Sequence, residues 1–287
     1  MDKILIIRNV SRAFSNFKLD SLNIALSGGN ILGIIGSNGA GKTTLIRLIL
    51  NIIEADTGDI MILRKSNKDV TVKQDIGIAF DNSFFLPTWS ANDIEKAISG
   101  FYKNWDSCRY NEILGKFKIN RTLKVAKMSR GTQLKLMVAF AISHNARLLI
   151  LDEPTSGLDL PARYELLNIL KEYVSDGKNS VIFSSHIVSD IKEIADHIIV
   201  LQNGNVLYSN SLSCLLDKYI VVKGRKNDLH LIDRYVKNID FANGTFKALA
   251  DSKDSALISM NKFEIEVDSL ENIVFLLEKD NMSLNTI

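Results

Sequence analysis

The sequence predicts an α/β protein built on a largely parallel core sheet, and three observations favour this fold class. Short apolar runs typical of buried strands alternate with longer segments in which apolar residues recur at helical spacing. A glycine-rich turn joins one of these runs, residues 31–35, directly to a helical segment. One extended helical block, about residues 84–144, interrupts the alternation, so we expect it to be a subdomain inserted between two strands.

In the first part of the chain, the apolar runs that favour strands are residues 4–9, 19–26, 31–35, 60–63 and 76–80. A polar turn at residues 11–16 separates the first two runs, and Gly28-Gly29 predicts a hairpin-like turn into the third. That third run is apolar at almost every position, which suits a strand buried on both faces. The apolar residues that follow it at helical spacing are Leu45, Ile46, Ile49 and Ile53.

The inserted block is predicted to contain three helices, at residues 91–101, 106–117 and 129–143. The elements expected after it are strands at 148–151, 181–184, 198–201 and 206–208, and helices at 162–174 and 187–195. Asn203-Gly204 lies between the last two strands and is a strong signal for a tight turn that joins neighbouring strands. Strands that alternate with helices in this way are typical of a parallel sheet.

The last part of the chain has a different character, because the motifs described below stop at about residue 218. The elements expected there are strands at 219–222, 246–250, 257–260 and 263–267, and helices at 229–236 and 270–278. This part of the sequence contains no charge run or low-complexity tract, either of which would indicate a disordered tail. We therefore expect a main domain over residues 1–217 and a small α+β accessory domain over residues 218–287.

Composition excludes several classes of function. The net charge of +2 is too balanced to indicate a nucleic-acid-binding surface. The two cysteines, Cys108 and Cys214, lack metal-ligand spacing, so we expect them to be reduced residues of a cytosolic protein. The first residues do not have the pattern of a secretion signal. No apolar run approaches the length of about 18 residues that spans a bilayer, so any membrane-spanning part must be supplied by other chains.

The glycine-rich turn carries the first functional motif. Gly36, Gly41, Lys42 and Thr43 satisfy the phosphate-loop pattern G-x-x-x-x-G-K-[ST], with a strand before it and a helix after it. In such a loop, backbone N–H groups converge on phosphate oxygens, the lysine reaches the β and γ phosphates, and the hydroxyl can bind Mg²⁺. The residues expected to bind nucleotide here are Gly36, Ser37, Asn38, Gly39, Ala40, Gly41, Lys42, Thr43 and Thr44. The alternative is a glycine-rich turn with a chance lysine.

Two adjacent acids end the strand at residues 148–151. A buried strand that ends in acids is costly unless a cation compensates them, and a cation beside the phosphate loop is the natural partner. Asp152 is therefore expected to hold Mg²⁺ through a water molecule, and Glu153 to orient and deprotonate the water that attacks the γ-phosphate. The alternative is an acidic pair that begins an ordinary loop.

A histidine closes another buried strand, at Ser184-Ser185-His186. His186 can contact the γ-phosphate or the attacking water, and we expect it to belong to the catalytic group with Glu153. Without the other two motifs, a lone histidine at a strand end is more often a surface residue or a capping residue.

Together these motifs give the chain a family resemblance. Residues 36–44, 129–133 and 148–159, with His186, follow the order and approximate spacing found in ATP-binding-cassette (ABC) ATPases, and the resemblance covers about residues 1–211. It implies a phosphate-loop core sheet, an antiparallel β subdomain and an inserted helical subdomain. It also implies a head-to-tail dimer in which each ATP lies between the phosphate loop of one subunit and the signature segment of the other. The residues that this implies for ATP binding are Ser129, Gly131, Gln133 and Asp159, with Phe14 stacking on adenine.

The chain departs from the family pattern at two positions. The signature usually reads Leu-Ser-Gly-Gly-Gln, whereas here residues 128–133 read Met-Ser-Arg-Gly-Thr-Gln, with Arg130 adding a positive charge. A glutamine that reaches Mg²⁺ in the family is replaced by Asp81. A carboxylate is a good ligand for a hard cation, so the expected metal ligands are Thr43, Asp81 and Asp152. The alternative is that Asp81 only forms a turn before Asn82.

Both departures resemble those of single-domain ABC ATPases that power bacterial exporters of peptides, antibiotics or other amphipathic compounds. This implies separate transmembrane permease subunits, a second ATPase subunit in a homodimer or heterodimer, and a peripheral location on the cytoplasmic face of the cell membrane. In such systems the membrane subunit docks on the helical subdomain, near the cluster Phe84, Phe85, Leu86 and Trp89. The cluster is either a docking groove or plain core.

Two other classes of function compete with the transporter hypothesis. A soluble ABC ATPase of DNA repair or translation usually carries a coiled-coil insertion or two cassettes, and neither a repeat nor a heptad run is visible here. A nucleotide-binding regulator would keep Lys42 but would be indifferent to replacement of Glu153.

Overall fold

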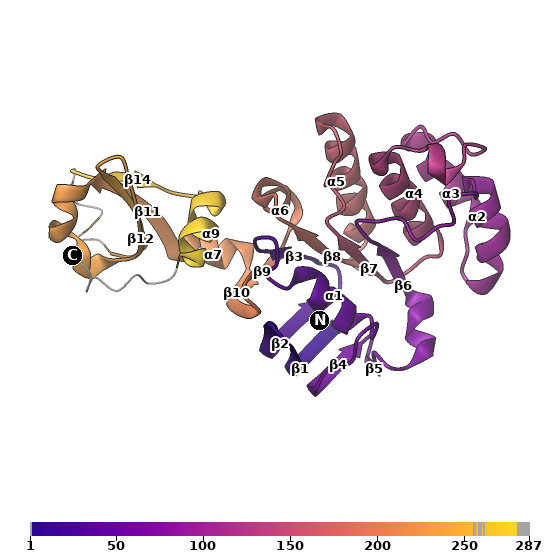
Figure 1. The fold of residues 1–287 in the computed structure, drawn as a ribbon, viewed down its shortest axis with the longest axis horizontal. Coiled ribbons are helices and arrows are strands. Elements are labelled where there is room, and N and C mark those ends of the chain that lie inside the picture. The colour runs from indigo at the N-terminus through magenta and orange to yellow at the C-terminus, as the bar shows by residue number, and fades with distance from the viewer. Residues whose placement is uncertain (1, 255–256, 258–259, 261, 280–287) are drawn as a thin grey trace. The chain divides into compact units, whose positions relative to one another are not determined.

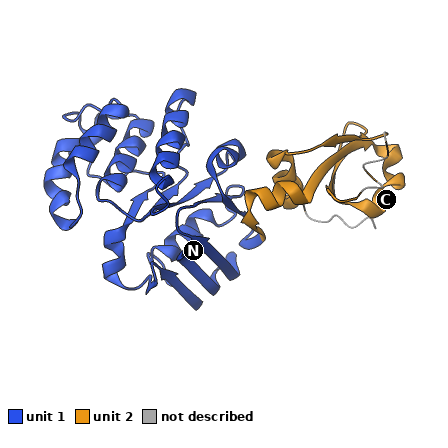
Figure 2. Ribbon diagram, turned by 180° about the vertical axis from the view of Figure 1, so that it is seen from behind, with its two compact units in different colours: residues 1–206 blue, residues 207–287 orange. Residues whose placement is uncertain are grey.

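The fold is described from a computed structural model of the 287-residue chain, and the description covers residues 2–254, 257, 260 and 262–279. The chain divides into two compact units, Met1–Val206 and Leu207–Ile287 (Figure 2). The division precedes the boundary expected after residue 217, and it falls within a strand, β10, Asn205–Ser211. Each unit is described by itself.

The first unit contains an antiparallel sheet of four strands in the order β2-β1-β4-β5 (Figure 1). Its strands are β1, Lys3–Phe14, β2, Phe17–Ser27, β4, Thr57–Ile62, and β5, Lys65–Ser66. The polar turn predicted at residues 11–16 is wrong for its first four residues, because β1 continues to Phe14. Irregular register between β1 and β2 after Ile7 and after Val10 accompanies this polar continuation.

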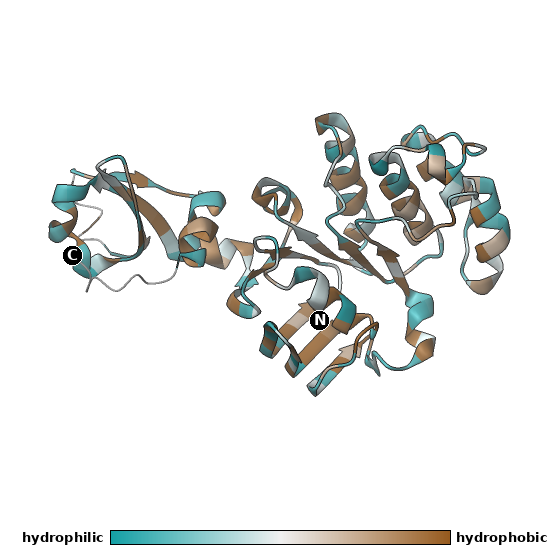
Figure 3. Cartoon of the chain, viewed as in Figure 1, coloured by the Kyte–Doolittle hydropathy of each residue, from teal (hydrophilic) through white to brown (hydrophobic). Residues whose placement is uncertain are grey.

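The core of this unit is a six-stranded sheet in the order β10-β9-β3-β8-β7-β6, which Figure 3 shows to be rich in hydrophobic residues. Besides β10, its strands are β3, Ile31–Ile35, β6, Ile76–Ala79, β7, Leu148–Asp152, β8, Ser180–Ser185, and β9, His197–Gln202. The β3–β8, β3–β9, β7–β8 and β6–β7 pairs are all parallel, as predicted. Every residue of β3, β7 and β8 is buried, which explains why these strands are rich in apolar residues.

The turn at Gly28-Gly29 does not form a hairpin. The strands on its two sides, β2 and β3, belong to different sheets. The turn is held instead by the Gly28 N–H, which donates to the Asp2 carbonyl, and by the Gly29 N–H, which donates to Ser180 Oγ at 3.0 Å. It therefore carries the chain from the antiparallel sheet into the core sheet.

The helices of the first unit lie where the sequence predicts them, with ends that differ by a few residues. The helices next to the core sheet are α1, Lys42–Ile49, α5, Leu160–Val174, and α6, Val188–Ile194. The inserted subdomain between β6 and β7 contains α2, Ala91–Ile98, α3, Ser107–Lys116, and α4, Arg130–Ser143. Short 3₁₀ turns complete the unit at Val70–Asp75, Ser99–Phe101 and Val125–Lys127.

The second unit has a four-stranded antiparallel sheet in the order β12-β13-β11-β14. Its elements are α7, Leu212–Lys218, β11, Tyr219–Arg225, β12, Val236–Ala242, β13, Thr245–Asp251, β14, Glu264–Glu266, and α9, Leu270–Glu278. The helix predicted at residues 229–236 is wrong: this segment forms 3₁₀ turns at Lys226–Leu231 and Asp233–Tyr235, and β12 follows. Of the strand predicted at 257–260, only Leu257 and Met260 are described, and the prediction is wrong at Leu257, which is helical.

Candidate nucleotide-binding and hydrolysis site

A cavity of about 620 Å³ lies where β3 passes into α1. Its lining residues are Asn16, Phe17, Asp81, Asp152, Glu153, Asn203 and residues 37–44. The carboxyl ends of parallel strands meet at one edge of a sheet, which is where ligands of α/β proteins bind. Segments far apart in the sequence therefore meet at this cavity, as the motifs predict.

The phosphate loop needs glycine at two of its positions. At Gly36, an added Cβ would lie 2.5 Å from the Leu201 carbonyl oxygen, which is closer than real side chains come. Gly41 has a φ of 113°, and a Cβ there would lie 2.7 Å from the Phe17 ring. Gly41 is the N-cap of α1, so no capping side chain accepts a hydrogen bond from the first N–H groups of the helix. The first turn of α1 also contains no acidic residue. The N–H groups of that turn are consequently free to bind an anion.

Lys42 is buried beside this loop, with only 6% of the residue exposed. Its ammonium donates to the Gly36 carbonyl at 2.7 Å and lies 3.1 Å from Glu153 Oε1. A buried ammonium needs an anionic partner, and Glu153 supplies one here. Phosphate oxygens at the start of α1 would compete with Glu153 for the same ammonium group.

The two acids at the end of β7 are held differently. Asp152 is 3% exposed, and its Oδ2 accepts a hydrogen bond from Thr43 Oγ1 at 2.7 Å. Its Oδ1 accepts from Ser184 Oγ at 2.6 Å. Glu153 instead contacts His186, whose Nδ1 lies 2.7 Å from Oε2. The phosphate loop, the acidic pair and the histidine therefore form one hydrogen-bonded group.

The donor set at Asp152 fits Mg²⁺. Thr43 and Asp152 supply a hydroxyl and a carboxylate oxygen, the hard ligands that this cation prefers. Among the described residues, no group of three or more His, Cys, Asp and Glu side chains could hold a metal ion alone. Mg²⁺ commonly takes its remaining ligands from substrate phosphates and water.

Asp81 also lines the cavity, and its carboxylate forms an ion pair with the Arg130 guanidinium at the start of α4. Both of these residues depart from the family pattern, and the structure joins them. The pair connects the loop after β6 to the inserted subdomain. Sequence spacing gives no sign of the pair, because the two residues belong to separate motifs.

The other predicted nucleotide contacts lie outside this cavity. Ser129 Oγ accepts from the Thr132 N–H at 3.1 Å and so caps α4, and Asp159 Oδ1 caps α5 through the Ala162 N–H at 2.9 Å. The Gln133 amide donates to the Val125 and Met128 carbonyls. Gly131 lies close to Leu158, where a Cβ would come within 2.9 Å of a methyl group. These residues do not contact the phosphate loop of their own subunit in the described structure.

The aromatic residues predicted at the nucleotide site and in the cluster at residues 84–89 lie only partly where they were expected. Phe17 lines the cavity, whereas Phe14 does not, although the two ring centroids are 6.2 Å apart. Asn16, Asn203 and Ser184 also belong to the site, and only their position beside predicted motifs hinted at this. In the cluster at residues 84–89, Phe85 packs edge-on against Phe140 in the core. Phe84 and Leu86 are 45% and 52% exposed.

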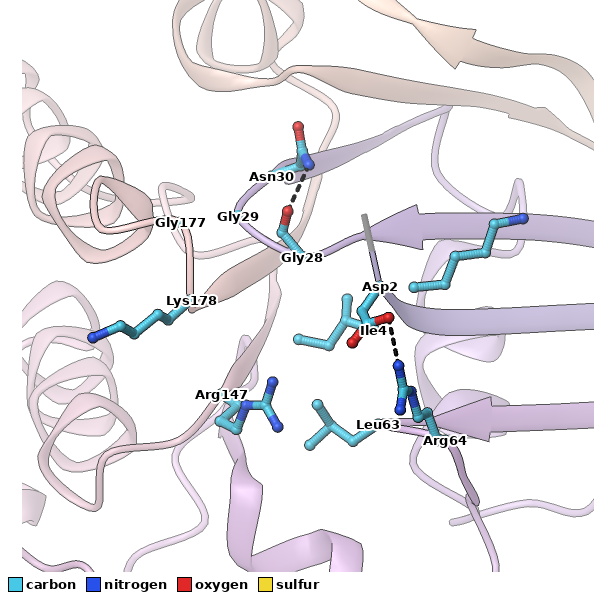
Figure 4. Close-up of a pocket in the computed structure, with 11 residues that line it drawn as sticks. Asp2, Ile4, Gly28, Gly29, Asn30, Leu63, Arg64, Arg147, Gly177 and Lys178 are labelled. Carbon is cyan, nitrogen blue, oxygen red and sulfur yellow. Dashed lines mark hydrogen bonds and ion pairs between the residues drawn. The ribbon is translucent and has the colours of Figure 1, made fainter.

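A second cavity, of about 580 Å³, contains none of the predicted site residues and is drawn in Figure 4. Asp2, Arg64, Arg147 and Lys178 are among its lining residues. Arg64 is paired with Asp2 at 2.5 Å, and Figure 4 shows Lys178 extending away from both. Its charged groups therefore do not converge on one point.

The fold and the first cavity define a phosphate-loop nucleoside triphosphatase. A family model described as ABC transporter matches residues 19–156. The chain is 30% identical over 265 residues to an uncharacterised ABC transporter ATP-binding protein of Synechocystis, covering 85% of this chain and 74% of that protein. It is 32% identical over 214 residues to the bacitracin transport ATP-binding protein BcrA of Bacillus licheniformis, covering 72% and 69%.

Solved structures share the fold. An ATP-binding subunit of an ABC transporter aligns with a TM-score of 0.67 at 23% identity, over 74% of this chain and 91% of that one. A dimeric ATP-binding cassette in a post-hydrolysis state, bound to ADP and phosphate, aligns with a TM-score of 0.63 at 22% identity, over 72% and 98%. The chain belongs to the ATP-binding proteins of ABC transporters, and it is an ATPase. No helix in the part of the chain that is described is long and apolar enough to cross a membrane.

Proposed function

We propose that this chain powers the export of a peptide, an antibiotic or another amphipathic compound through separate membrane-spanning subunits, from the cytoplasmic face of the membrane. Its similarity to a protein named for bacitracin transport supports this class of cargo. The alternative, a soluble ABC ATPase of DNA repair or translation, is less favoured, because the relatives described above are named as transporter proteins.

The observation that carries the hydrolysis part of the proposal is the contact of Glu153, which lines the cavity, with both Lys42 and His186. We assign Glu153 as the general base for the attacking water, and His186 as the residue that orients it and senses the γ-phosphate. Lys42 and the N–H groups at the start of α1 bind the β and γ phosphates. When phosphate takes the Lys42 ammonium, Glu153 Oε1 is released and can accept a proton, while His186 still holds Oε2.

Thr43 and Asp152 would hold Mg²⁺, with Asp81 as a further ligand. When bound, Mg²⁺ supplies positive charge to the phosphate oxygens. Asp81 Oδ1 is paired with Arg130, so the direction of the Asp81 carboxylate depends on the position of the inserted subdomain. The hydroxyl of Thr43 already faces Asp152, which keeps both oxygens at the cavity.

We further propose that Ser129, Gly131, Gln133 and Asp159 complete the site of a second ATPase subunit in a homodimer or heterodimer. Their position outside their own subunit's cavity supports this. Phe14 remains the proposed adenine contact, together with Phe17, which already lines the cavity. The exposed Phe84 and Leu86 are the proposed contact for the membrane subunit, since exposed apolar clusters are typical of interaction sites.

The test is Glu153→Gln, which keeps the shape of the side chain and removes the base. We expect ATP binding to stay intact, ATP turnover to fall by about 10²–10⁴-fold, and an ATP-dependent dimer to accumulate. Glu172→Gln is a matched control on the exposed face of α5 and should leave turnover unchanged. Normal turnover in Glu153→Gln would contradict the assignment.

The transporter hypothesis has its own test. The trapped Glu153→Gln form, purified from membranes of the native cell, is expected to carry a multi-spanning protein with it. Recovery of the trapped dimer without any membrane protein would leave the ATPase assignment in place and refute the transporter role. Residues 218–287 are proposed to be an accessory domain, and their removal should leave ATP binding by the main domain intact.

A further inference from the structure

Ser184 is a buried hydroxyl placed between the two acids of the site. It lies near the end of β8, is fully buried, and is paired with Asp152 on the neighbouring parallel strand β7. Its Oγ donates to Asp152 Oδ1 at 2.6 Å and accepts from the Glu153 N–H at 3.0 Å. A serine hydroxyl has a single donor, so this one is committed to Asp152.

The first of these bonds fixes the direction of the Asp152 carboxylate. With Oδ1 held by Ser184, the other oxygen, Oδ2, faces Thr43 and the phosphate loop. Hydrogen bonds to a carboxylate are charge-assisted and therefore stronger than those between neutral groups. Outer groups that hold a metal-binding carboxylate in this way decide how well the carboxylate binds its cation.

The second bond holds the backbone of Glu153 in an unusual conformation. Glu153 has a φ of 52°, in the left-handed region that residues with a side chain rarely adopt. Such a conformation persists only where the surroundings hold it. The Ser184 hydroxyl accepts from the N–H of this residue, at the point where the chain leaves β7 and turns the Glu153 side chain toward Lys42 and His186.

We propose that Ser184 is a positioning residue for ATP hydrolysis: one hydroxyl sets both the metal-facing oxygen of Asp152 and the backbone turn that presents Glu153. Ser184 does not line the cavity, so it acts through the two acids and not on the nucleotide. The inference rests on the roles proposed above for Asp152 and Glu153.

The chain offers a matched control at the other end of the same strand. Ser180 is also fully buried on β8, and its Oγ also accepts a hydrogen bond from a backbone N–H, that of Gly29, at 3.0 Å. Replacing either serine by alanine removes a buried hydroxyl that holds a backbone group. Only the replacement at 184 also affects the acids.

The experiment compares Ser184→Ala, Ser184→Thr and Ser180→Ala in the full chain. It measures kcat, the Mg²⁺ concentration for half-maximal turnover, the affinity for a fluorescent ATP analogue without Mg²⁺, and the thermal midpoint. For Ser184→Ala we expect kcat to fall, and the half-maximal Mg²⁺ concentration to rise, by about 10-fold each, with little change in analogue affinity. Ser184→Thr should keep kcat and the half-maximal Mg²⁺ concentration near those of the unmodified chain, because it keeps the hydroxyl. Ser180→Ala should change neither kcat nor the half-maximal Mg²⁺ concentration.

Normal kcat and Mg²⁺ dependence in Ser184→Ala would overturn the inference. Equal losses in Ser184→Ala and Ser180→Ala would overturn it too, because they would mark a general effect of removing a buried hydroxyl. A Ser184→Thr variant that is as impaired as Ser184→Ala but keeps the thermal midpoint of the unmodified chain would also overturn it, because its hydroxyl is present and the added methyl group does not disturb the packing. The Glu153→Gln variant separates the two levels: if it is inactive while Ser184→Ala is normal, only the role of Ser184 fails.

Discussion

Two ion pairs join α5 to α6, and they differ mainly in burial. The Arg163 guanidinium pairs with Asp190, whose side chain is 1% exposed and whose Oδ2 has no hydrogen-bond partner. Lys171 pairs with Glu193 at 2.5 Å, with the two side chains 42% and 50% exposed. Arg163→Ala leaves a buried carboxylate without its cation, so we expect it to lower the free energy of unfolding by about 3–5 kcal/mol. Lys171→Ala should cost about 0–1 kcal/mol.

The assay is urea unfolding followed by tryptophan fluorescence, since Trp89 and Trp105, the two tryptophans of the chain, both lie in the first unit. With a slope of about 2–3 kcal/mol per molar urea, Arg163→Ala should move the midpoint down by about 1–2.5 M. Lys171→Ala should move it by less than about 0.5 M. Equal shifts in the two variants would refute the argument from burial.

Three further predictions concern single contacts. Burial lowers the pKa of His144 below its ordinary value of 6.5, so the unfolded chain binds this proton more readily than the folded one. The contribution of His144 to the stability of the fold is therefore complete above pH 6.5 and falls as the pH drops below that value. His144→Gln should make the thermal midpoint depend less on pH between about pH 7 and 5. Ser90→Ala removes the capping box of α2 and should cost about 1 kcal/mol in urea unfolding; no loss would contradict the capping role. Asp81→Ala and Arg130→Ala should each cost less than about 1 kcal/mol in the same assay, because their ion pair is exposed, and a larger cost would mark a structural role.

The parts of the fold that could be predicted are those with a strong local pattern. β3, β7 and β8 are buried at every residue, so their apolar runs stand out in the sequence. β12 has no fully buried residue, and the sequence predicts no strand over residues 237–242. The polar end of β1 was missed because it contains polar residues at partly exposed positions that still pair with β2.

The site divides in the same way. The phosphate loop and the acidic pair are each a short continuous segment of the sequence, so the spacing of residues within each segment predicts them. The contact of Ser184 with Asp152 depends on the register between β7 and β8, which sequence spacing does not specify. The pairing of Asp81 with Arg130 depends on how the inserted subdomain packs, and it could only be found in the structure.

The contact between Lys42 and Glu153 has a consequence for selectivity. An anion that binds the Lys42 ammonium would compete with the Glu153 carboxylate, which lies 3.1 Å from it. A simple anion such as chloride exchanges one ionic contact for another and gains little. A triphosphate makes further hydrogen bonds with the N–H groups at the start of α1, which offset the lost contact. The internal carboxylate thereby acts as a competitor that favours polyphosphates over the common salts of the cell.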